Sequence, residues 1–80
     1  MDGFTQKFSV TDNKNAEIHL IMTTVYKSLK EKGYNPINQI VGYILSEDPT
    51  YITNYNNARA LMGKLDRDDI LRALVINYLE

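Results

Sequence analysis

The chain has 80 residues, nine Lys and Arg against ten Asp and Glu, and a formal net charge of −1. A chain of this length forms one small domain, which buries only about 60–65% of the surface that its unfolded chain exposes. The balanced charge supplies no field to attract nucleic acid or anionic lipid, and the absence of cysteine excludes disulfides and thiolate metal sites.

No charge-free apolar run approaches the roughly 18 residues needed to cross a bilayer, and the N-terminus lacks the apolar stretch of a signal peptide. We therefore expect a cytoplasmic protein with no membrane partner. A second copy is the simplest source of additional core for so small a chain, so we also predict a homodimer.

Residues 1–14 are mostly polar and contain only three bulky apolar residues, Phe4, Phe8 and Val10. This composition predicts a flexible N-terminal arm. A short strand over 8–11 is an alternative, which would need a strand of a second chain as its partner. The arm contains Thr5, where phosphorylation would add about −1.5 to −2 charges.

Residues 15–80 are predicted to form a single helical domain that begins with a helix over 15–32. Asn13 or Asn15 offers an N-cap, and Gly33 ends the helix because glycine accepts a positive φ. The apolar residues recur at steps of three and four, which places them on one helical face. They are Ile18, Ile21, Met22, Val25 and Leu29.

A second helix is expected over 36–46, because Asn35 supplies a side-chain acceptor at the N-cap and Pro36 a fixed φ at the first helical position. Its residues are apolar nearly all around the cylinder, which indicates a central or interface position. Asp48 and Pro49 repeat this start signal, but the β-branched and aromatic residues after them favour only a short helix.

A third helix is predicted over 54–65, and a fourth begins after Asp66 as its cap, with Asp69 near the positive end of the helix dipole. Four helices joined by short loops favour an all-α fold, a compact bundle. The expected buried stripe of the fourth helix consists of Ile70, Leu71, Leu74, Val75, Tyr78 and Leu79.

Groups suited to catalysis are few. His19 is the only histidine, so the chain has neither a Cys/His nucleophile pair nor a Cys/His metal cluster. The four glycines are isolated and form no phosphate-binding loop. We therefore expect no enzymatic activity, no cofactor and no metal.

Two other functions are weaker alternatives. Asp66, Asp68 and Asp69 could bind a hard cation in a metal-assisted hydrolase, but helix capping explains the same residues. Short helices with tight turns also suit a helix-turn-helix regulator that binds nucleic acid. The helix over 54–65 carries only two cations, Arg59 and Lys64, which argues against such binding.

Arg59, Lys64 and Arg67 form a modest basic group. Solvated charges are the simpler interpretation, and a phosphate- or partner-docking site is the functional one, since guanidinium groups fork onto phosphate oxygens. The six tyrosines have a similar pair of interpretations, either ordinary packing at the rim of the core or the lining of a dimer or partner surface.

The segment 31–49, EKGYNPINQIVGYILSEDP, closely resembles the core of the IreB/ReoM family of small regulatory phosphoproteins from Gram-positive bacteria. The similarity extends over most of residues 16–80. The matching core residues are Gly33, Tyr34, Asn35, Pro36, Asn38, Gln39, Gly42, Tyr43, Asp48 and Pro49.

This resemblance implies a non-enzymatic helical homodimer that is phosphorylated by a PASTA-type Ser/Thr kinase and reset by a PP2C-type phosphatase. It also implies regulation of the envelope stress response and of peptidoglycan synthesis, with the Clp protease adaptor machinery as a possible partner. The phosphothreonine of the family lies in a Thr-x-x-Phe context, which Thr5 and Phe8 match, so Thr5 is the expected acceptor.

The chain departs from the family pattern in two places. Asp2 holds the position of a second acceptor threonine found in some relatives, so double phosphorylation is not expected. Asn54, Gly63 and Lys64 stand where relatives carry arginine, which weakens any docking role of the basic helix.

Overall fold

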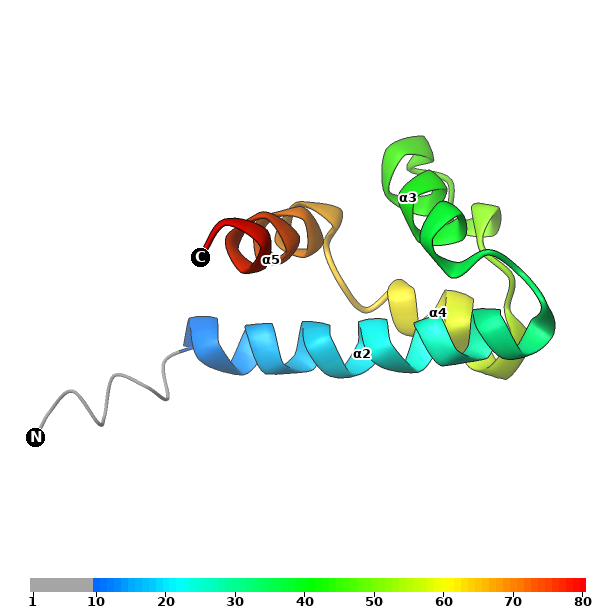
Figure 1. Cartoon of the computed structure of the whole chain (residues 1–80), viewed down its shortest axis with the longest axis horizontal. Coiled ribbons are helices and arrows are strands. Elements are labelled where there is room, and N and C mark those ends of the chain that lie inside the picture. The colour runs from blue at the N-terminus through cyan, green and yellow to red at the C-terminus, as the bar shows by residue number, and fades with distance from the viewer. Residues whose placement is uncertain (1–9) are drawn as a thin grey trace, which may run out of the picture.

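The longest element of the structure is helix α2, Val10–Lys32, which runs along one side of the molecule (Figure 1). The computed structural model describes residues 10–80. The prediction of an all-α fold with about four helices is confirmed for this part, which contains four α-helices and no strand. After α2 come α3 (Pro36–Ser46), the 3-10 helices η1 (Pro49–Tyr51) and η2 (Tyr55–Asn57), α4 (Ala58–Met62) and α5 (Arg67–Leu79).

Helix α2 begins at Val10, five residues before the start expected from the capping signals. The chain has no Gly or Pro between positions 4 and 32, so no residue strongly opposes the helix there. Residues 10–14 of the expected N-terminal arm therefore belong to α2, and the strand considered for 8–11 is wrong for Val10 and Thr11. Residues 1–9 lie outside the described part.

Gly33 ends α2 as predicted, because its φ of 97° lies in the left-handed region that favours glycine. The N–H of Gly33 donates to the carbonyl of Lys30 at 3.1 Å, and the N–H of Tyr34 donates to the carbonyl of Leu29 at 3.0 Å. This pair of bonds is the Schellman arrangement, which satisfies carbonyls at the end of a helix.

The predicted start of α3 is also confirmed. The side chain of Asn35 accepts a hydrogen bond from the N–H of Asn38 at 3.1 Å, and Pro36 occupies the first turn. The second start signal gives only η1, a single 3-10 turn in which Asp48 accepts from the N–H of Thr50 at 2.9 Å. Local signals were therefore sufficient to place both turns.

The third predicted helix is much shorter than expected, since α4 covers only Ala58–Met62 rather than 54–65. Asn56 and Asn57 have φ values of 51° and 63°, which interrupts the helical backbone before α4 begins. Asparagine is among the few residues that adopt this left-handed conformation at low cost. Gly63 follows α4 directly and belongs to the turn that leads to α5.

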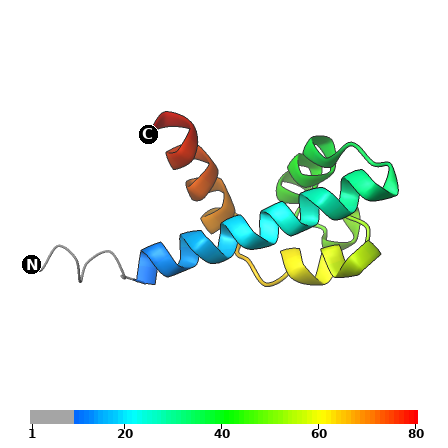
Figure 2. The same cartoon turned by 60° about the horizontal axis from the view of Figure 1, so that its bottom comes forward.

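The core lies where α3 and α4 pack against α2, with the first turns of α5 at one end, as Figures 1 and 2 show. Burial of apolar surface at about 25 cal/mol per Å² is the main stabilising contribution of such a core. No described helix is both long and apolar enough to span a membrane. The largest fully buried side chains are Val25, Leu29, Ile52, Met62 and Ile70.

Helix α5 is the largest departure from the expected packing. Of the six residues predicted as its buried stripe only Ile70 is buried, and Ala73 is the other buried residue of this helix. The remaining five, from Leu71 to Leu79, are 44–88% exposed. The cause is geometric, because α5 rises away from α2 after its first turns, so its C-terminal half is covered only in part (Figure 2).

Asp66 occupies the N-cap position of α5 by its backbone, with φ −77° and ψ 138°, but its side chain makes no capping hydrogen bond. The capping role predicted for this carboxylate is therefore not seen. Its backbone carbonyl instead accepts the N–H of Ile70 at 3.1 Å. Asp68 and Asp69 lie in the first turn, where they favour the positive end of the helix dipole as expected.

Candidate functional site

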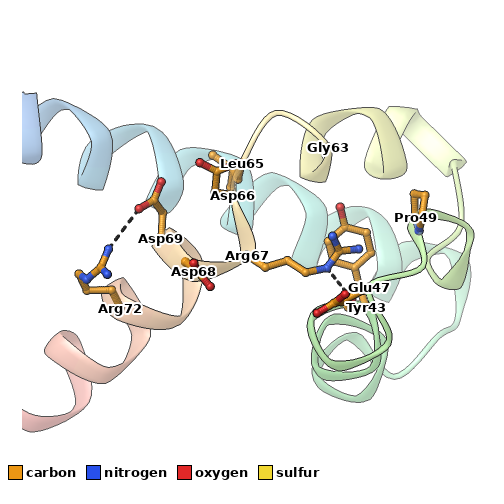
Figure 3. Close-up of a pocket in the computed structure, with 10 residues that line it drawn as sticks. All are labelled: Tyr43, Glu47, Pro49, Gly63, Leu65, Asp66, Arg67, Asp68, Asp69 and Arg72. Carbon is orange, nitrogen blue, oxygen red and sulfur yellow. Dashed lines mark hydrogen bonds and ion pairs between the residues drawn. The ribbon is translucent and has the colours of Figure 1, made fainter.

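A hollow of about 650 Å³ lies between the C-terminal end of α3, the turn before η1 and the start of α5 (Figure 3). We call it the Tyr43–Arg67 groove. It combines residues of the 31–49 segment with a residue of the predicted basic group. Its lining residues are Tyr43, Glu47, Pro49, Gly63, Leu65, Asp66, Arg67, Asp68, Asp69 and Arg72.

Arg67 is held firmly on the wall of this groove. Its guanidinium carbon lies 4.3 Å from the centroid of the Tyr43 ring, which is only 3% exposed. Its Nε donates to the backbone carbonyl of Tyr43 at 3.1 Å. Arginine suits this position because its planar group stacks on an aromatic ring while its edge donates hydrogen bonds.

One terminal nitrogen of Arg67, Nη2, is buried without a hydrogen-bond acceptor among the described residues. A buried donor without a partner is unfavourable, and each such group in a native structure calls for an explanation. Within residues 10–80, Nη2 is therefore an unsatisfied buried donor on an otherwise fixed cation.

The turn at Asp48 feels the charge of two of the predicted basic residues. The hydroxyl and the N–H of Thr50 donate to Asp48 Oδ1 at 2.7 and 2.9 Å, and these hydrogen bonds lower the pKa of Asp48. The charges of Arg59 and Arg67 lower this pKa further. Both arginines thus act on one turn, although they belong to different helices.

The three predicted basic residues have different surroundings. Arg59 is half-buried, and its Nε donates to the carbonyl of Ile52 at 2.9 Å. Arg67 is fixed on Tyr43 as described. Lys64 is exposed and does not line the Tyr43–Arg67 groove.

Most residues of the 31–49 segment belong to α3 and its flanking turns and do not line the groove. Gly33, Asn35 and Pro36 form the connection between α2 and α3. Gly42 lies directly against the ring of Tyr51, so a side chain there would displace the ring. Within that segment, only Tyr43, Glu47 and Pro49 line the groove.

The other segment residues lie near the surface. Tyr34 and Asn38 are exposed, and Gln39 is half-buried. Thr5, the expected phosphorylation site, lies outside the described residues, so the structure gives no position for it.

Some contacts of the site residues carried no sequence signal. Asp69 accepts from Lys14 Nζ at 3.1 Å and from Arg72 Nη1 at 3.3 Å, and the first of these contacts joins residues 55 positions apart. Such a pair cannot be read from local spacing. Glu47 was missed for a different reason, because nothing in its neighbours indicates that the chain turns left-handed there.

The acidic residues at the start of α5 do not make a metal site. Among residues 10–80, no three His, Asp or Glu side chains lie close enough together to hold a metal ion. Asp69 is instead engaged by the two cations just described.

Comparison with known protein families gives one match for this chain. The model of the family described as IreB regulatory phosphoprotein matches residues 3–80. The matched range includes the 31–49 segment, the whole Tyr43–Arg67 groove and the expected phosphorylation site.

Proposed function

We propose, since the chain belongs to the IreB family of regulatory phosphoproteins, that it is a non-enzymatic regulator whose binding to other proteins is controlled by phosphorylation. The family match over residues 3–80 is the observation that carries this proposal. The resemblance of the 31–49 segment supports the finer assignment. In this finer assignment, Thr5 is the acceptor, a PASTA-type Ser/Thr kinase adds the phosphate, and a PP2C-type phosphatase removes the phosphate.

The proposed output is control of the envelope stress response and of peptidoglycan synthesis in the cytoplasm, with the Clp protease adaptor machinery as the protein partner. The Tyr43–Arg67 groove is the proposed docking surface for this partner. Its support is that residues of the family segment meet a fixed arginine there, whose Nη2 lacks an acceptor among residues 10–80. The fixed positive charge of Arg67 on the groove wall would attract an acidic side chain of a partner.

We also propose that the chain acts as a homodimer. The support is an apolar groove of about 430 Å³ formed by α2, α3 and α5, together with the exposed apolar residues of α5. Exposed apolar surface of this extent marks an interaction site in small proteins. The groove is lined by Met22, Thr23, Tyr26, Ile37, Ile40, Val41 and Leu74.

The phosphorylation proposal is tested by incubating the purified chain with the PASTA-type kinase of the same species and mapping the product by mass spectrometry. We expect one phosphate, on Thr5, and none on the matched variant Thr5→Ala. Modification confined to residues 10–80, or no modification, would refute the assignment of Thr5.

The docking proposal is tested by capture of the Clp adaptor protein of the same species on the immobilised chain. We expect Arg67→Gln to reduce capture at least about tenfold, since the fixed positive charge on the groove wall is lost. Lys27→Gln removes the same charge from an exposed position of α2 and is the control. Equal capture by the two variants would exclude the groove as the docking surface.

A further inference from the structure

A second hollow, of about 220 Å³, lies where the N-terminal part of α2 meets α5. We call it the Lys14–Arg72 groove. Its floor is apolar, because Ile18 and Ala73 are buried there, and its rim carries two cations. It is lined by Lys14, Asn15, Ile18, Asp69, Arg72, Ala73 and Ile76.

The two cations on the rim share a single carboxylate. Lys14 Nζ lies 3.1 Å from one oxygen of Asp69, and Arg72 Nη1 lies 3.3 Å from the other. This hydrogen bond and charge from Asp69 raise the pKa of Lys14, while Asp66 and Glu17 act on it more weakly. The Lys14 and Arg72 side chains are 48% and 66% exposed, and exposed ion pairs are weak enough to exchange partners.

Thr5 is close enough to Lys14 to reach this groove, but it is too far from Arg59 to reach that residue. Thr5 lies five positions before Val10, a stretch that spans at most about 18 Å, and Lys14 lies only about 6 Å from Val10 along the axis of α2. Arg59 belongs to α4, which lies beside the C-terminal half of α2 (Figure 1), and Asn56, just before α4, donates to Glu31 at 3.3 Å. Glu31 is about 31 Å from Val10 along the helix axis.

The chemistry of the arm also matches the groove. Phe4 directly precedes Thr5, so phosphorylation places an apolar ring beside a dianion. An apolar floor beside two cations suits this pair of groups. A phosphate dianion also satisfies two cations better than the single charge of the shared Asp69 carboxylate does.

We infer that phosphorylated Thr5 docks in the Lys14–Arg72 groove of its own chain, with the phosphate bound by Lys14 and Arg72 and Phe4 on the apolar floor. This inference rests on the proposed phosphorylation of Thr5. The phosphate replaces the Lys14–Asp69 ion pair with a doubly charged bridge between α2 and α5. Phosphorylation thereby fixes α5 on α2 and changes how the exposed apolar residues of α5 are presented to a partner.

The test uses a chain that carries phosphothreonine at position 5 by chemical ligation. A synthetic peptide of residues 1–15 is joined to residues 16–80 prepared as Ala16→Cys, and desulfurisation then restores Ala16. The natural sequence has no cysteine, so this step alters nothing else. The pKa of the phosphate, about 6 when free, is followed by ³¹P NMR in the chain and in the free 1–15 phosphopeptide.

We expect the pKa of the phosphate to be about one unit lower in the chain than in the peptide. Lys14→Gln combined with Arg72→Gln is expected to abolish this difference. Arg59→Gln combined with Lys64→Gln removes the same charge elsewhere and is expected to preserve it. Amide resonances of Asn15 and Ile76 should shift on phosphorylation only in chains that retain Lys14 and Arg72.

Equal pKa values in chain and peptide, or a difference lost only with the Arg59 and Lys64 variants, would overturn the inference. Because the phosphate is installed chemically, this outcome does not depend on the kinase. A kinase that leaves Thr5 unmodified refutes the proposed function alone. A kinase that modifies Thr5, together with an unshifted pKa, refutes only the docking site.

Discussion

Glu47, the residue that ends α3, has a left-handed backbone with φ 59° and ψ 18°. A side chain with a Cβ atom is disfavoured in this conformation by roughly 1–2 kcal/mol, whereas glycine adopts it readily. Glu47→Gly is therefore expected to raise the free energy of unfolding by about 1 kcal/mol. Urea denaturation followed by far-UV circular dichroism measures the change.

The matched control for this substitution is Lys27→Gly, at an exposed position inside α2. Glycine lowers stability there by about 0.5–1 kcal/mol, because a glycine backbone loses more conformational freedom on folding than that of other residues. A loss of stability in both variants would show that the carboxylate of Glu47 contributes more than its backbone strain costs.

Asn35 makes the side-chain cap that starts α3, by accepting the N–H of Asn38. Asn35→Ala is expected to lower the free energy of unfolding by about 1 kcal/mol, the usual effect of removing such a cap. Asn38→Ala leaves the same hydrogen bond intact, since only the backbone of Asn38 takes part in it. Thermal denaturation should therefore separate the two variants, and equal melting temperatures would contradict the capping role.

At the scale of the element, α4 is too short to be stable by itself. It has five residues, far below the roughly 12–15 that an isolated helix needs in water. Its stability comes from packing, since Ala58 and Met62 are fully buried against α2. The existence of α4 is thus a consequence of tertiary contacts rather than of local propensity.

Met62→Ala is expected to lower the free energy of unfolding by about 2–5 kcal/mol, because a cavity replaces a fully buried side chain. That is a large part of the roughly 5 kcal/mol available to a domain of this size. The neighbouring Leu61→Ala removes a half-buried side chain of similar volume and should cost less. Similar losses of unfolding free energy in the two variants would contradict the central position of Met62 in the core.

The whole molecule leaves as many large apolar side chains exposed as it has apolar residues in its core, thirteen of each in the described part. A small domain with this balance is marginal without a partner. The proposed homodimer removes part of this surface from water, and the apolar groove between α2, α3 and α5 is the concave region proposed for it.

Val41→Asp places a charge in this groove and is expected to convert the dimer to a monomer in sedimentation velocity experiments. A buried unpaired carboxylate costs far more than one side chain contributes to an interface. Asn38→Asp adds the same charge to an exposed position of the same helix and should leave the dimer intact. A natural chain that sediments as a monomer at high concentration would refute the dimer itself.

The sequence by itself determined the features that depend on neighbours along the chain. The helical class, the end of α2 at Gly33, the start of α3 at Asn35 and the turn at Asp48 follow from residues with specific backbone preferences or capping groups. The family also followed from the sequence, because its diagnostic residues are contiguous over 31–49.

Only the tertiary structure decided which surfaces these elements bury. The periodicity of α5 predicted a buried stripe, but an apolar face is buried only where another element meets it, and α5 diverges from α2. The stacking of Arg67 on Tyr43 and the pairing of Lys14 with Asp69 join residues 24 and 55 positions apart. Local spacing does not predict such contacts, because they depend on how the helices pack against one another rather than on how each helix forms.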